Sequence, residues 1–235
     1  MEIGVLKNIW GKNKNGIFTR DFSIDRLQLY LPLWHPELNG STIVSKDLNA
    51  HSCTVTEAVW GVTGRTFDTN NDQIDCGKNS VLDGSSDTTV IVWFKKAALG
   101  AEGCFVSKNN VNLQDRYRFK VASTNKLGVD KECQDGGLLT VSSASVTISA
   151  ATWYFAAVRF GAAGVSLVQD STEVGADATN TTVLTAGTAS SLFIGDDYNG
   201  NGAPGATIGD VLIYRRYLSA GELENIRQAT KWRYA

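Results

Sequence analysis

Short runs in which apolar and polar side chains alternate recur along most of the chain and indicate β-strands. The clearest run is 116–121, Arg-Tyr-Arg-Phe-Lys-Val, in which every second side chain is apolar. Successive side chains of a strand point to opposite faces, so this run predicts a strand with one solvated and one buried face. Two other runs, 89–94 and 153–160, are apolar almost throughout. They predict central strands that are buried on both sides.

Further runs rich in β-branched and aromatic residues are separated by Gly, Asn, Asp and Ser, and they predict more strands. The stretch 175–191 is poor in charge, so we expect a loop or an edge strand there. Many short strands with turn residues between them are typical of a β-sandwich or barrel. The additional predicted strands are 27–31, 73–76, 104–107, 165–169, 192–194 and 207–214.

One helix is expected near the C-terminal end. Ser219 is followed three residues later by Glu222, which is the capping-box pattern of a helix start. Leu218 and Leu223 are placed to form the hydrophobic staple that accompanies such a cap. Leu223 and Ile226 fall on one face of this helix, which we expect to lie against the sandwich.

The composition is that of a globular domain without a basic excess. The chain has 235 residues, a length that suits one large β domain, and its formal net charge is −2. This charge argues against a nucleic-acid partner. No run approaches the roughly 18 apolar residues that a membrane span needs, so no membrane insertion is expected. The first residues lack the order of a secretory signal peptide.

The four cysteines form no metal-binding pattern. None lies in a C-x-x-C pair, and the chain has only two histidines, so no zinc site is predicted. We expect buried thiols that pack as small apolar residues, although the spacing leaves disulfides open. The cysteines are Cys53, Cys76, Cys104 and Cys133.

Residues 1–22 differ from the rest and are interpreted as an N-terminal arm, with the sandwich over 23–235. The arm has more basic than acidic residues and carries apolar side chains such as Ile9 and Trp10. Apolar groups of this size favour docking on a neighbouring surface. The alternative is a frayed terminus or an ordinary first strand.

Several motifs occur in the order found in one known family. These motifs lie at 29–33, 64–77, 89–95, 105–108, 152–159, 192–195 and 208–223. Over about residues 25–230 the chain resembles laminin-G-like jelly-roll domains of the concanavalin-A-like lectin/glucanase superfamily. The resemblance implies an all-β fold, a two-sheet antiparallel jelly-roll β-sandwich with one short C-terminal helix. Because the matched positions are mostly core and cap residues, the resemblance supports the fold better than a function.

The resemblance also implies a calcium site. Members of the family often bind one calcium ion, which prefers about six to eight oxygen ligands. The matching metal candidates are Asp210, Asp47 and Asn49. The chain departs from the pattern at Gly209, where the family has a first aspartate. The alternative is that Asp210 caps or pairs at a strand end.

The loop 195–202 is the best candidate for ligand binding. Carboxylate and amide groups can hydrogen-bond sugar hydroxyls, and a tyrosine ring can stack on a sugar face. The alternative is a hairpin loop without a ligand. The candidate ligand-binding residues are Asp196, Asp197, Tyr198, Asn199 and Asn201.

Other polar and aromatic positions are weaker candidates. Trp34, His35 and Trp60 lie in predicted loops, where an exposed tryptophan could serve as a sugar platform. The stretch 68–72 is rich in Asp and Asn, and a tight turn explains it fully.

No catalytic pattern is present, so an enzyme is not expected. Glucanases of the superfamily carry carboxylates two or four residues apart on one strand, which places them on one face. No predicted strand has this spacing. Glu222 and Glu224 lie on the predicted helix, where residues two apart diverge.

These observations favour a non-catalytic surface or assembly protein with a lectin-like sandwich. The first hypothesis is a virion component, such as a phage capsid decoration or tail accessory protein, that binds glycans. It would contact other virion or surface proteins through residues 1–22, form an oligomer or assembly, and act at a virion or extracellular surface. The alternative is a carbohydrate-binding module excised from a secreted polysaccharide-degrading or adhesive protein. A glucanase or lyase is the third hypothesis.

Overall fold

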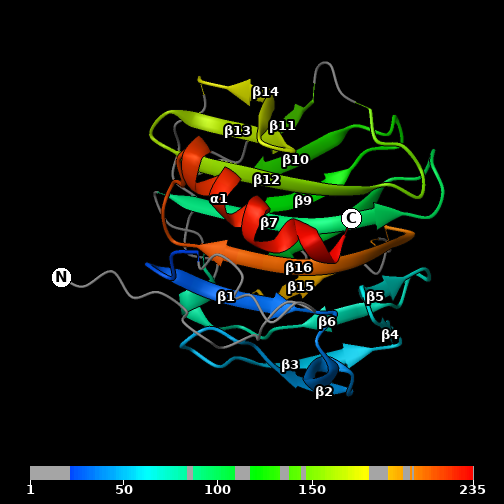
Figure 1. Ribbon diagram of the computed structural model, residues 1–235. Coiled ribbons are helices and arrows are strands. Elements are labelled where there is room, and N and C mark those ends of the chain that lie inside the picture. Colours follow the sequence, from blue (N-terminus) through cyan, green and yellow to red (C-terminus); the bar gives the residue numbers. More distant parts are fainter. Residues whose placement is uncertain are drawn as a thin grey trace.

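Two antiparallel β-sheets packed face to face make up the protein, as the computed structural model shows (Figure 1). The structure describes residues 22–83, 87–108, 117–132, 138–143, 147–179, 190–197, 202 and 204–234. The predicted all-β jelly-roll sandwich with one short C-terminal helix is confirmed. We call the sheet that contains β7 the front sheet and the sheet that contains β8 the back sheet.

The front sheet has the strand order β14-β13-β12-β7-β16-β5-β4, and β1 also pairs with β16. The long strands β7, β12 and β16 form its centre, and each contains nine residues. The strands of the front sheet are β1 (Leu27–Pro32), β4 (Val59–Gly61), β5 (Gly64–Phe67), β7 (Thr88–Lys96), β12 (Trp153–Gly161), β13 (Gly164–Gln169), β14 (Thr172–Asp177) and β16 (Ala206–Tyr214).

The back sheet has the strand order β11-β10-β9-β8-β15-β6-β3-β2. Its strands mostly alternate, with apolar side chains towards the front sheet and mostly polar ones on the outer face. In β8 a register shift places both Phe105 and Val106 in the core. The strands of the back sheet are β2 (Thr42–Val44), β3 (Ser52–Thr56), β6 (Gln73–Asp75), β8 (Gly103–Lys108), β9 (Tyr117–Val121), β10 (Leu127–Glu132), β11 (Leu138–Ser142) and β15 (Leu192–Ile194).

The main hydrophobic core fills the space between the two sheets. Phe94 of the front sheet and Phe105 of the back sheet meet with ring centroids 4.2 Å apart. Phe119 packs edge-on against Phe105. All three side chains are fully buried. The two sheets are therefore held by aromatic contacts at their centre, as burial of large apolar area favours.

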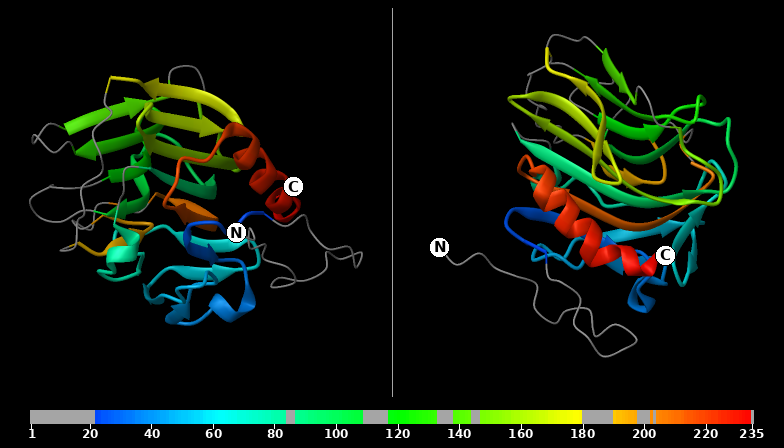
Figure 2. Two further views of the ribbon diagram at one scale, coloured as in Figure 1. Left: turned by 90° about the vertical axis from the view of Figure 1, so that its left-hand side faces the viewer. Right: turned by 45° about the horizontal axis from the view of Figure 1, so that its top comes forward.

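The helix α1 (Ala220–Thr230) lies across the outer face of the front sheet (Figures 1 and 2). Its start has the predicted capping box, in which Ser219 and Glu222 hydrogen-bond each other's backbone amides. Leu223 and Ile226 join a second buried cluster with Trp93 and other side chains of the front sheet. Because α1 covers this face, β7 and β12 are apolar on both sides, as their sequences predicted. The described residues also form three 3-10 turns: η1 (Pro36–Leu38), η2 (Ser80–Leu82) and η3 (Lys231–Arg233).

Every strand that was predicted from the sequence is present, with ends that differ by one or two residues within the described part of the chain. Short polar strands such as β2 and β3 were not predicted. The stretch 175–191 overlaps the edge strand β14, and its residues 180–189 lie outside the described part. One expectation was wrong: the polar face of β9 is not freely solvated, because Lys120 is buried and Arg118 is partly buried.

The proposed arm lies almost wholly outside the described residues, which begin at Phe22. The ring of Phe22 packs edge-on against Tyr30, with centroids 5.6 Å apart, so Phe22 belongs to the sandwich. The division into an arm and a sandwich stays a prediction. Within the described residues, no helix is long and apolar enough to span a membrane.

Candidate functional site

One outward-facing side chain from each strand of the back sheet lies in a single row across its outer face. Cross-strand pairing defines this row, because residues directly opposite on antiparallel strands have neighbouring Cβ atoms on the same face. The adjacent residues, such as Ile74, Ile194 and Phe119, point into the core. In spatial order, the row is Thr42, Thr54, Asp75, Phe193, Ser107, Arg118, Asp130 and Thr140.

Phe193 is the one aromatic and the one apolar member of this row. Its chain neighbours Leu192 and Ile194 are fully buried, whereas Phe193 is only partly buried. It lies opposite Asp75 on one side and Ser107 on the other. A ring on the outer face adds nothing to the core between the sheets. It offers an apolar surface among polar groups.

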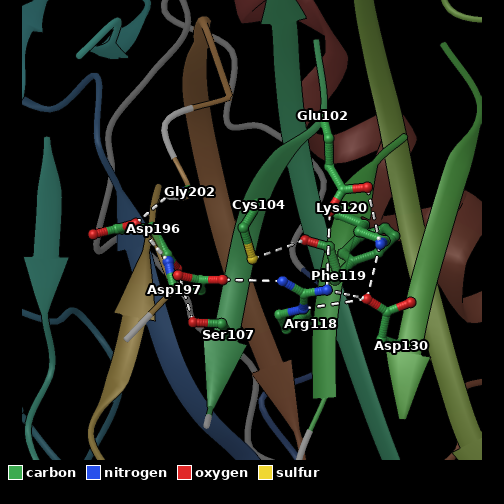
Figure 3. A network of polar contacts seen from close by, with 10 residues as sticks. All are labelled: Glu102, Cys104, Ser107, Arg118, Phe119, Lys120, Asp130, Asp196, Asp197 and Gly202. Atoms are coloured by element: carbon green, nitrogen blue, oxygen red, sulfur yellow. Dashed lines mark hydrogen bonds and ion pairs between the residues drawn. The ribbon is translucent and has the colours of Figure 1, made fainter. Parts of the chain in front are cut away.

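The row has two halves of different character. The half formed by Thr42, Thr54, Asp75 and Phe193 is exposed or partly exposed, and we call it the open half. In the open half, one oxygen of Asp75 accepts a hydrogen bond from the Gly77 amide at 2.7 Å. The half formed by Ser107, Arg118, Asp130 and Thr140 is tied together by ion pairs and hydrogen bonds, and we call it the braced half. Figure 3 shows Ser107, Arg118 and Asp130 of this half.

Arg118 is the centre of the braced half. Its Nη2 atom lies 2.5 Å from Oδ2 of Asp130, and its Nη1 atom lies 3.0 Å from Oδ2 of Asp197. Lys120 lies 2.8 Å from Asp130 and 3.1 Å from Glu102. Figure 3 shows how Arg118 joins Asp197, at the end of β15, to Asp130 on β10. Two cationic side chains from β9 thus connect β10, the residue before β8 and the loop after β15.

The ionisation of this network follows from its charges. Burial disfavours the carboxylate of Asp130, but the hydrogen bonds and charges of Lys120 and Arg118 outweigh burial and lower its pKa. Burial also opposes the charge of Arg118, yet Asp130 and Asp197 raise its pKa above the usual value. Asp130 and Arg118 are therefore both charged at neutral pH, and their ion pair braces the sheet.

The loop after β15 enters the same network. Oδ1 of Asp196 accepts hydrogen bonds from the amides of Asp197 and Gly202, at 2.7 and 2.8 Å. The Ser107 hydroxyl donates to the carbonyl of Asp196 at 2.7 Å. Asp196 and Asp197 are both buried, so their carboxylates serve the loop and Arg118. The other predicted ligand residues, Tyr198, Asn199 and Asn201, lie outside the described residues.

Asp196 makes a pH-dependent contribution to stability. Burial raises its pKa to about 6, against the hydrogen bonds from the two backbone amides. The usual aspartate pKa is near 3.9, so between about pH 4 and 6 the folded protein binds more protons than the unfolded chain. The contribution of Asp196 to the free energy of unfolding therefore falls as the pH rises from about 4 to 6.

We expect Asp196→Asn to raise the free energy of unfolding at pH 8 by about 1–3 kcal/mol, because amide replaces a buried charge. At pH 4 the gain should vanish, since Asp196 is then largely protonated in the folded protein. Urea unfolding at both pH values measures this difference. The matched control is Asp25→Asn at an exposed carboxylate, which should show no such pH dependence. A gain of equal size at pH 4 and pH 8 would refute the assignment.

The predicted calcium residues have other partners. Asp210 is fully buried, and Oδ2 accepts hydrogen bonds from Arg233 at 3.1 Å and Tyr234 at 2.6 Å. A guanidinium group thus stands where a cation would bind. At Gly209, a Cβ atom would come within 2.4 Å of the Tyr234 hydroxyl, so the aspartate of the family pattern has no room here.

The other half of the proposed calcium site is also engaged. Asp47 accepts hydrogen bonds from the amides of Tyr30 at 2.9 Å and Asn49 at 2.8 Å. The Asn49 side chain donates to the carbonyl of Gln28 at 3.1 Å. Among the described residues, no group of three or more His, Cys, Asp or Glu side chains could hold a metal ion. The described residues do not fit the calcium site that the resemblance implied, and calcium binding stays a prediction.

Trp34 and His35 have structural roles. Trp34 donates its indole N–H to Asp210 at 3.1 Å, and the Arg233 guanidinium stacks on its ring at 4.3 Å. His35 caps η1 by accepting from the amide of Glu37. Trp60 lies on the edge strand β4 and is partly buried.

Two further groups of carboxylates are also accounted for. Asp72 closes the predicted 68–72 turn by accepting the amides of Asp68 and Thr69. On α1, Glu222 and Glu224 are paired with Arg216 and Arg227.

Sequence reasoning found the strands of the candidate site but did not single out the side chains of the row. Phe193, Asp75 and Arg118 were treated only as parts of strands. The alternation in Leu-Phe-Ile at 192–194 was the available signal, because it places Phe193 on the face opposite to its two neighbours. The row itself needed the pairing of strands that lie far apart in the sequence.

The sequence of the chain also matches a known family. The family model described as concanavalin A-like lectin/glucanases superfamily matches residues 68–224. The chain belongs to this superfamily. The match includes β6 to β16, and therefore Phe193 and the braced half as well as the start of α1. No curated protein sequence matches this member of the superfamily.

Solved structures of similar fold agree with the membership in the superfamily. The binding domain of Paraclostridial Mosquitocidal Protein 1 has a TM-score of 0.66 and 18% identity, over 86% of this chain and 52% of its own. The binding domain of botulinum neurotoxin serotype G has a TM-score of 0.65 and 12% identity, over 85% and 50%. Trypanosoma rangeli sialidase has a TM-score of 0.62 and 11% identity, over 88% and 33%. The chain thus spans about half the length of the two toxin domains, and the likeness concerns the fold.

Proposed function

We propose that the protein is a non-catalytic glycan-binding domain that uses the open half of the row. The observation that carries this proposal is the partly buried Phe193 within a row of hydroxyl and carboxylate groups on an outer sheet face. A sugar ring has an apolar face for the aromatic ring, and its hydroxyl groups fit Thr54 and Asp75 as hydrogen-bond partners. The braced half keeps the neighbouring strands in place.

The spacing of the carboxylates supports binding without catalysis. Glycosidases need two carboxyl groups about 5–9.5 Å apart across the scissile bond. Along the row, Asp75 on β6 and Asp130 on β10 are separated by three strands, which amounts to about 19 Å. Asp130 is also fully engaged by Arg118 and Lys120. The row therefore lacks a pair of carboxylates that could act on one glycosidic bond.

The charge of the face favours neutral glycans. The network in Figure 3 contains the carboxylates of Glu102, Asp130, Asp196 and Asp197 against the two cations of Arg118 and Lys120. Asp75 adds another carboxylate in the open half. The excess of negative charge would repel a sulfated or sialylated glycan, whereas it would not repel a neutral glycan.

A separate proposal concerns the larger protein or assembly to which the domain belongs. The structures of similar fold that are titled binding domains belong to longer chains, which supports a module within a larger binding protein. The virion assembly role was predicted from residues 1–22, of which only Phe22 is described. A version of the chain that lacks residues 1–21 tests that role, because it should keep glycan binding and lose assembly.

A glycan array that compares neutral with sulfated and sialylated oligosaccharides tests the proposed function. We expect binding to neutral glycans, and we expect Phe193→Ala to weaken it about tenfold or more, or ~1.4 kcal/mol, because the stacking surface is lost. Phe193→Tyr should retain binding, since it keeps the ring. Trp232→Ala is the matched control, because Trp232 is an exposed aromatic residue in η3, away from the back sheet. Binding confined to anionic glycans, or unchanged by Phe193→Ala, would contradict the proposal.

A further inference from the structure

Two buried cysteines lie directly opposite each other on neighbouring strands of the back sheet. Strands β3 and β6 pair Thr54 with Asp75, and the antiparallel register continues by one residue to bring Cys53 opposite Cys76. Both cysteine side chains belong to the core between the sheets. Cys53 is 0% and Cys76 is 3% exposed, so each thiol is shielded from solvent.

The neighbouring Cys53 thiol, together with burial, raises the pKa of Cys76 well above its usual value. Residues directly opposite on antiparallel strands have Cα atoms about 4.5–5.5 Å apart. A disulfide spans Cα separations of about 4.4–6.8 Å. The strands therefore already stand at a distance that a disulfide can bridge.

The third described cysteine provides a contrast. Cys104 lies opposite Lys120 on the outer face of the back sheet, and its thiol donates to the carbonyl of Phe119 at 3.6 Å. Burial raises its pKa above the usual value. In the described part of the chain, Cys53 and Cys76 are thus the cysteines that the sheet places face to face.

We propose that Cys53 and Cys76 are a modification site that forms a disulfide bond with a small-molecule disulfide, such as oxidised glutathione, as the oxidant. The thiolate of one cysteine attacks glutathione disulfide, forms a mixed disulfide and releases one glutathione thiol. The second cysteine thiolate attacks the protein sulfur of the mixed disulfide and releases the second glutathione thiol. Two S–H bonds are lost and one S–S bond forms. The two electrons and two protons pass to glutathione, which leaves as two thiols.

The bond would fasten an edge of the sandwich. Between the two cysteines the chain leaves the back sheet, forms β4 and β5 at the edge of the front sheet, and returns as β6. A disulfide would close this excursion covalently and reduce the freedom of the unfolded chain over residues 54–75. Because the thiols are buried, oxidation takes place during folding or when the edge opens.

Refolding the protein with oxidised glutathione, and in parallel with excess reductant, tests the proposal. Peptide mapping by mass spectrometry without reduction should find Cys53 linked to Cys76. The oxidised protein should melt roughly 5–10 °C above the reduced protein. Cys53→Ala and Cys76→Ala should each abolish this difference, whereas Cys104→Ala and Cys133→Ala should keep it.

The melting temperatures of the oxidised and reduced forms are compared within each variant. A loss of stability that the substitution itself causes affects both forms and therefore does not change their difference. The peptide map of the wild-type protein shows whether the Cys53–Cys76 disulfide forms, even where a variant does not fold. A map without the Cys53–Cys76 link, or a link to Cys104 or Cys133 in its place, overturns the proposal. An oxidised protein that melts no higher than the reduced one also overturns it. Glycan binding plays no part in these outcomes.

Discussion

Replacing Arg118 with methionine is expected to lower the free energy of unfolding by about 3–5 kcal/mol. The substitution removes the guanidinium group that lies within 3.0 Å of both Asp130 and Asp197. Asp197 is buried, so its carboxylate would lose this charged partner in a region of low dielectric. Lys120 still contacts Asp130, which places the expected loss towards the lower end of the range. Urea unfolding at pH 7 measures the change.

Arg227→Met is the matched control for Arg118→Met. Arg227 also forms a close ion pair, at 2.7 Å from Glu224, but this pair lies on the surface of α1. An exposed pair of this kind contributes at most about 1 kcal/mol. Equal losses for the two variants would mean that the braced half is no more than a set of surface ion pairs.

Replacing Asp210 with asparagine is expected to cost a similar amount, about 3–5 kcal/mol. Asp210 is fully buried and accepts hydrogen bonds from Trp34, Arg233 and Tyr234. Burial opposes the charge of Arg233, but Asp210 outweighs it and raises the pKa of Arg233 above its usual value. Asparagine keeps the shape but leaves the buried guanidinium without its counter-charge. The C-terminal residues after α1 should detach first, and tryptophan fluorescence should report this.

The same variant separates an ion pair from a calcium site. Asp25→Asn, at an exposed carboxylate, is the control and should leave stability unchanged. If Asp210 served calcium, a chelator would lower the melting temperature of the wild-type protein by the linkage of binding to folding. The contacts of Asp210 predict no effect of a chelator, and a clear effect would restore the calcium assignment.

The fold could be predicted from the sequence where local patterns matched the final environment. The capping box at Ser219 and Glu222 forms from residues within one turn, so it could be predicted without knowledge of the tertiary structure. The apolar strand 89–94 became β7, since burial on both faces leaves a plain sequence signal. Strands β2 and β3 were missed, because they have few residues and each alternates with polar side chains at an edge of the sheet.

The site was harder to predict, because it depends on the order of the strands. The sequence places Phe193 far from Asp75 and Arg118, and only the pairing of β15 with β6 and β8 brings them into one row. The charged face of β9 was expected to be solvated, but partners from other strands bury it. Asp196 was expected to face a ligand, yet it binds the amides of its own loop. The sequence alone therefore could not tell which polar residues of a loop bind a ligand and which stabilise the loop.

The crystal structure of the protein with a neutral oligosaccharide that it binds on the array is the most direct test of the central claim. The account predicts a sugar ring stacked on Phe193, with sugar hydroxyls hydrogen-bonded to Asp75 and Thr54 on the outer face of the back sheet. A sugar bound at Trp34 and Trp232, or at any place that leaves Phe193 without contact, would contradict the account.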